Sequence, residues 1–170
     1  SRILRSLNKE ETKSIPTAGV TCIDGDITLY WNREFLASLT KKEVMGLLKH
    51  ECLHLVFGHT SERRRDPHII WNYGTDLAIN STIPIHELPQ GGLIPGKELT
   101  LEKSQLDNMS NEEIDKFNKL SKLISSFPLN KTSEYYFEKL MSDNEIKDFL
   151  EEMSKGQEIS IGFDDHDGWD

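Results

Sequence analysis

Residues 50–54 read His-Glu-Cys-Leu-His, which places two histidines four positions apart. Residues four apart on a helix lie about 40° apart around its axis, so His50 and His54 project from one face and can bind one metal ion. Glu51 lies about 100° round from His50, where its carboxylate can take a proton from a metal-bound water. The pattern predicts a divalent metal site. The alternative is a solvated helix face that happens to hold two histidines.

Zinc (Zn2+) is the metal that this pattern favours, because two imidazoles, a third protein ligand and a water form its open catalytic arrangement. Cys52 is two residues from both histidines, so on a helix it faces away from them. We therefore expect Cys52 to be a thiol of the protein core and not a ligand.

The residues around the motif have the signature of a helix. Thr40 followed by Glu43 forms a capping box, in which each side chain bonds the backbone of the other residue. Apolar residues then recur at helical spacing, and Gly58 is suited to end the helix. The pattern predicts a helix from about Lys41 to Phe57.

The third metal ligand can come from two places. Asp76 lies on a second predicted helix, which we expect to start with Asp66 as the N-cap and to end at Ile83-Pro84. A carboxylate on an otherwise apolar helix needs a partner, because burying a lone charge is costly. His59 follows His54 by five residues and reaches the metal only if the helix breaks at Gly58. The sequence favours Asp76, with His59 as the alternative third ligand.

The composition restricts the classes of partner. The 170 residues carry a net charge of -9, with 36% hydrophobic and 29% charged residues. This acidic balance argues against nucleic acid and membrane as partners, because phosphate groups are bound by clustered cations. The two cysteines are too few for a disulfide framework, and the longest apolar runs are too short to span a membrane. We therefore expect a cytoplasmic protein.

The pattern along the chain predicts an α+β fold. Residues 18–31 alternate in polarity around Asp24-Gly25, which is typical of a β-hairpin. Helices are predicted over about 111–124, 133–141 and 144–153. We expect a catalytic core over residues 1–100, a helical extension packed on it over 101–160, and an acidic tail over 161–170 at a domain boundary.

Several segments together resemble a known family, the predicted metallopeptidase domain that is found N-terminal to von Willebrand A-like domains in bacteria and phages. The similar segments are Leu48–His54, Gly58-His59, Arg63-Arg64, Asp66-Pro67, Trp71-Asn72, Asp76–Asn80, Leu88–Pro95 and Glu134–Leu140. The resemblance implies a zincin-like fold, in which a small sheet packs on the H-E-x-x-H helix and on a following ligand helix. It also implies His50 and His54 as zinc ligands, Glu51 as the base, and a von Willebrand A-like domain or an ATPase as a partner.

The motif and the resemblance lead to one expected function, which is zinc-dependent hydrolysis of peptide bonds in a peptide or protein substrate. Zinc would be held by His50, His54 and Asp76, and Glu51 would activate the zinc-bound water. A non-catalytic zinc-binding interaction module is the first alternative, and a metal-dependent hydrolase acting on another bond is the second.

Two further expectations concern the substrate. By analogy with zincins, the strand Ile27–Trp31 is expected to pair with an extended peptide and to lay it beside the zinc. The sequence does not identify the group that stabilises the oxyanion. Its candidates are Tyr73, His59, His68 and His86.

Overall fold

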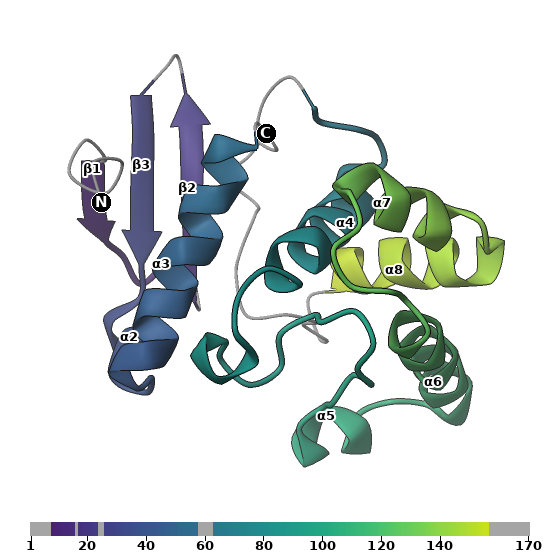
Figure 1. The fold of residues 1–170 in the computed structure, drawn as a ribbon. Helices are drawn as coiled ribbons and strands as arrows, with labels where there is room; N and C mark the ends of the chain where they lie inside the picture. Colours follow the sequence, from purple (N-terminus) through teal and green to yellow (C-terminus); the bar gives the residue numbers. More distant parts are fainter. Residues whose placement is uncertain (1–7, 16, 24–25, 58–62, 157–170) are drawn as a thin grey trace. The chain divides into compact units, whose positions relative to one another are not determined.

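The computed structural model describes residues 8–15, 17–23, 26–57 and 63–156 (Figure 1). It is a mixed α+β structure with a small three-stranded sheet and mostly helices, which confirms the predicted class. The chain divides into two compact units. The sheet unit contains the three strands, α2, α3 and the short 3-10 helix η1, and the helical unit contains α4 to α8.

The sheet is built from β1 (Asn8–Glu11), β2 (Ala18–Ile23) and β3 (Asp26–Trp31) in the order β1-β3-β2. β2 and β3 are antiparallel, with Val20 opposite Leu29, so the hairpin predicted over residues 18–31 is confirmed. The predicted turn at Asp24-Gly25 lies outside the described residues. β1 pairs with β3 in parallel.

The position of β3 corrects one expectation about the substrate. β3 is the central strand and is paired on both sides, to β1 and to β2. Its backbone groups are therefore already used in the sheet, and an extended peptide can add only to an edge strand. The prediction that Ile27–Trp31 pairs with a substrate peptide is wrong.

Two capped helices follow the sheet. α2 (Arg33–Ala37) starts at Asn32, whose side chain accepts bonds from the N–H groups of Glu34 and Phe35. α3 (Lys41–Val56) starts with the predicted capping box, in which both bonds between Thr40 and Glu43 are present. The predicted helix is thus confirmed to within one residue at its C-terminal end.

α3 packs closely against η1 (Ile85–Glu87) within the sheet unit. A Cβ atom at Gly46 would collide with the carbonyl group of Glu87, so only a glycine permits this approach. Lys49, one turn further along α3, pairs with the Glu87 carboxylate at 2.5 Å. This ion pair lowers the pKa of Glu87, mainly through the hydrogen bond from Lys49.

α4 (His68–Asn80) differs from its prediction at both ends. Pro67 has an extended backbone and is itself the N-cap, so Asp66 does not cap the helix, and the Asp66–Pro67 peptide bond is cis. The helix ends before the predicted Ile83-Pro84. The hydroxyl groups of Ser81 and Thr82 bond to the carbonyl groups of Ala78 and Ile79, which satisfies acceptors of the last turn.

α4 packs in the helical unit with α7 (Ser133–Met141) and α8 (Asn144–Gly156), and α6 (Asn111–Ser125) packs on α8. The helices α6, α7 and α8 were predicted from the sequence, whereas α2 and α5 (Lys103–Asp107) were not. At Gly74 a Cβ atom would lie 3.0 Å from the carbonyl oxygen of Ser133 and 3.1 Å from the amide nitrogen of Phe137. This glycine lets the backbones of α4 and α7 approach closely.

The helical unit has an extensive hydrophobic core. It includes Trp71, Leu77, Leu120, Tyr136, Leu140 and Leu150, contributed by α4, α6, α7 and α8. No helix in the part of the chain that the structure describes has the length and apolar character needed to cross a membrane. The predicted division at residues 100 and 160 stays a prediction.

We predict that Gly46→Ala destabilises the protein, because the new methyl group must push α3 and η1 apart. Overpacking of this kind costs about 1–3 kcal/mol of the free energy of unfolding. Urea denaturation measures the change. Met45→Ala is the control, since Met45 is half exposed on the same helix. A Gly46→Ala variant as stable as the control would contradict the described contact with Glu87.

Candidate metal centre

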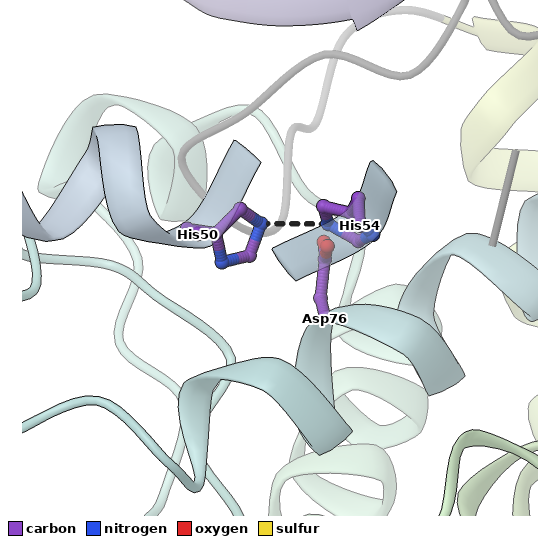
Figure 2. A group of neighbouring side chains, drawn as sticks. All are labelled: His50, His54 and Asp76. Carbon is purple, nitrogen blue, oxygen red and sulfur yellow. Dashed lines mark hydrogen bonds between the residues drawn. The ribbon is translucent and has the colours of Figure 1, made fainter. Parts of the chain in front are cut away.

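α3 brings the two histidines of the motif together. His50 and His54 lie one helical turn apart, both are fully buried, and their Nε2 atoms are 2.9 Å apart (Figure 2). The rings meet edge to face, with 4.6 Å between their centroids. At this distance one ring nitrogen donates a hydrogen bond to the other, so both nitrogens point toward the same small volume.

Asp76, predicted as the third ligand, is also buried, with 4% of its surface exposed on α4. Each of His50, His54 and Asp76 offers one ligand atom, and these three atoms all lie within 4.8 Å of one another (Figure 2). The structure therefore contains a buried His-His-Asp group that is able to hold a metal ion.

The donor set and its spacing fit a divalent metal. Two imidazole nitrogens and one carboxylate oxygen are a ligand set of catalytic zinc sites, and the ligand atoms of a tetrahedral zinc lie roughly 3.3 Å apart. The 2.9 Å between the two Nε2 atoms is close to that value. His54 lies in the last turn of α3, where the partial negative charge of the helix end also favours a cation.

Glu51 is only 1% exposed and lies on α3 next to His50. Its negative charge acts on the neighbouring Cys52. Burial raises the pKa of the Cys52 thiol, and the charge of Glu51 raises it further. Cys52 is only partly buried, so it is not the core thiol that the sequence predicts, and it does not belong to the His-His-Asp group.

The candidates for oxyanion stabilisation have different positions. Burial, together with the charge of Asp76, raises the pKa of Tyr73 above its usual range, so the phenol keeps its proton and can donate a hydrogen bond. His68 is the first residue of α4, and His86 is exposed in η1. His59, which was also the alternative third ligand, lies outside the described residues.

The polar residues around Asp76 on α4 have structural contacts that the sequence pattern did not predict. Asn80 donates to the carbonyl oxygen of Leu93 at 2.9 Å, and the Thr75 hydroxyl donates to the carbonyl oxygen of Asn72 at 2.8 Å. These bonds satisfy polar groups at buried positions, which explains two of the polar residues on this helix without a role in metal binding.

Comparison with known proteins gives a match to one sequence family. No curated protein and no solved structure gives a significant match. The sequence model of one family, described as "Putative metallopeptidase domain", matches residues 4–156, which is most of the chain. The chain belongs to this metallopeptidase domain family.

Proposed function

We propose that this protein is a zinc metallopeptidase of the zincin type, with His50, His54 and Asp76 as the metal ligands and Glu51 as the general base. The observation that carries the proposal is the buried His-His-Asp group, whose ligand atoms lie within 4.8 Å of one another. Membership of the metallopeptidase domain family supports the same conclusion. The substrate is a peptide or a protein.

Different residues of the chain have different roles in the proposed hydrolysis. When bound, the zinc ion makes a water molecule more acidic and polarises the carbonyl group of the substrate. The Glu51 carboxylate accepts a proton from the attacking water and transfers it to the nitrogen of the leaving amine. Glu51 lies on α3 next to the proposed ligand His50 and is 1% exposed. The protonated Tyr73 phenol is a candidate donor to the developing oxyanion.

One observation favours a second function, a zinc-binding module without catalysis. His50, Glu51, His54 and Asp76 are each at most 4% exposed, whereas a catalytic metal must be reached by its substrate. In this case zinc would support folding or the binding of a partner, and Glu51 would have no catalytic role. The two functions differ in turnover and not in zinc content.

We predict that the purified protein binds about one zinc per chain and that Asp76→Ala loses most of it, since a three-ligand site becomes a two-ligand site. Elemental analysis measures the bound zinc. His86→Ala is the matched control, because it removes an exposed histidine outside the group. A loss of zinc in His59→Ala but not in Asp76→Ala would instead assign the third ligand to His59.

Zinc binding should also stabilise the fold, because a ligand that binds the folded state alone raises the free energy of unfolding. We expect a chelator to lower the melting temperature of the wild type. The chelator should have little effect on Asp76→Ala, which would already lack the metal. Equal shifts in both proteins would show that the chelator acts elsewhere.

We predict that Glu51→Gln keeps its zinc and lowers kcat on peptides by about 10²–10⁴-fold, because the amide has the size of the carboxylate but cannot accept the proton. The measurement is the rate of cleavage of a peptide mixture by the zinc-loaded protein, followed by mass spectrometry. Undiminished cleavage by Glu51→Gln would exclude Glu51 as the base. Zinc binding with no cleavage even by the wild type would favour the interaction module.

A further inference from the structure

The sheet unit contains a pocket of ≈ 210 Å³ between the sheet and α3. Its deepest lining residues are Ala18, Leu29 and Leu47, which are all at most 5% exposed, together with Glu51. Apart from the Glu51 carboxylate, the side chains of this inner part are aliphatic. Such a lining favours an apolar group and offers few hydrogen bonds to a polar one.

The outer part of the pocket is open to solvent. Four of its lining residues are only partly buried, namely Trp31 on β3, Leu36 on α2, and Val44 and Leu48 on α3. Lys9 on the edge strand β1 also lines it and is exposed. An apolar group can therefore enter from solvent and be covered by apolar side chains on several sides.

The pocket lies directly beside the proposed base. Leu47 and Leu48 lie three and four residues after Val44, and Glu51 lies four and three residues after them, so the four residues form one stripe along α3. The next positions of this stripe include His54, a proposed zinc ligand. A group that fills the pocket is thus held next to the Glu51 carboxylate, and Glu51 precedes His54 on α3 by three residues.

We propose that this pocket binds one apolar side chain of the peptide substrate, next to the bond that is cleaved, and so sets a preference for leucine or phenylalanine at that position. The inference rests on the proposed peptidase function. The size supports a single side chain, because pockets that take a whole small molecule are larger, about 300–1,000 Å³. The lining supports an apolar side chain, since every lining side chain other than Lys9 and Glu51 is apolar.

The experiment makes the side chain at Val44, a partly buried residue of the pocket, larger in one variant and smaller in another. Val44→Phe reduces the space and Val44→Ala enlarges it. Met45→Phe and Met45→Ala are the matched controls, because Met45 is the next residue of the helix, is 50% exposed and does not line the pocket. The substrates are peptides that differ at one position, which carries alanine, leucine, phenylalanine or aspartate.

The zinc-loaded wild type should cleave the leucine peptide on the order of 10–200-fold better than the alanine peptide, as kcat/KM. Val44→Phe should reduce this ratio at least ~10-fold, and Val44→Ala should move the preference toward phenylalanine. The Met45 variants should keep the wild-type ratio. Cleavage with no apolar preference, or an unchanged ratio in both Val44 variants, would overturn the pocket assignment and leave the peptidase function standing.

A binding measurement separates failure of the pocket from failure of the peptidase. N-acetyl-leucine amide and N-acetyl-alanine amide are titrated into the full chain, and NMR shifts of the backbone amides of Trp31, Val44 and Leu48 are followed. Saturable shifts with the leucine compound that are weakened by Val44→Phe would support the pocket, even if no peptide were cleaved. Absence of such shifts, with normal folding, would identify the space as a gap in the packing between the sheet and α3.

Discussion

Burial of ionisable side chains is the physical constraint on which the candidate metal centre depends. His50, Glu51, His54 and Asp76 are at most 4% exposed, although charged groups lose several kcal/mol of hydration energy on burial. A divalent cation bound by two neutral imidazoles and one carboxylate would offset this loss through direct coordination. The same burial would strengthen the interaction of the cation with its ligands, because few water molecules would screen it.

The helices that carry these residues are held by ordinary packing. In the sheet unit, Gly46 permits the backbone of Glu87 to lie against α3. One turn further along α3, Lys49 forms an ion pair with the Glu87 side chain. In the helical unit, Gly74 permits the close approach of α4 and α7. Gly74 comes two residues before Asp76, so the backbone near the proposed ligand is fixed by packing in its own unit. Rigid backbone near a metal ligand is what keeps a coordination geometry available.

Local signals in the sequence predicted those features that depend on neighbouring residues. The Thr40–Glu43 capping box located the start of α3 because both of its bonds are formed within one helical turn. The motif placed His50 and His54 on one face for the same reason. Asp76 was singled out because a carboxylate is unexpected on an apolar helix, and it is indeed buried in the group with the two histidines. Its role as a ligand remains a proposal.

Features that depend on distant residues were not predictable in this way. β1 has four exposed residues and no alternation of polarity, so only its pairing with β3 makes it a strand. The start of α4 was misplaced because Pro67 suits a helix locally but has an extended backbone here. The pocket beside Glu51 could not be predicted from the sequence. The spacing of Val44 and Leu47 would be the same whether their side chains filled a core or lined an open pocket.

The strand order has a consequence for how the chain is made. β1 and β2 are synthesised first, yet both pair in this sheet with β3, the last strand to leave the ribosome. The sheet therefore cannot assemble stepwise from the N-terminus, because β1 and β2 have no partner strand in it until β3 emerges. The sequence of β1, Asn-Lys-Glu-Glu, is entirely polar, so this strand is well solvated before it pairs with β3. β2 differs from β1 in carrying Ala18 and Val20, which are buried in the finished structure and have no partner strand before β3 emerges.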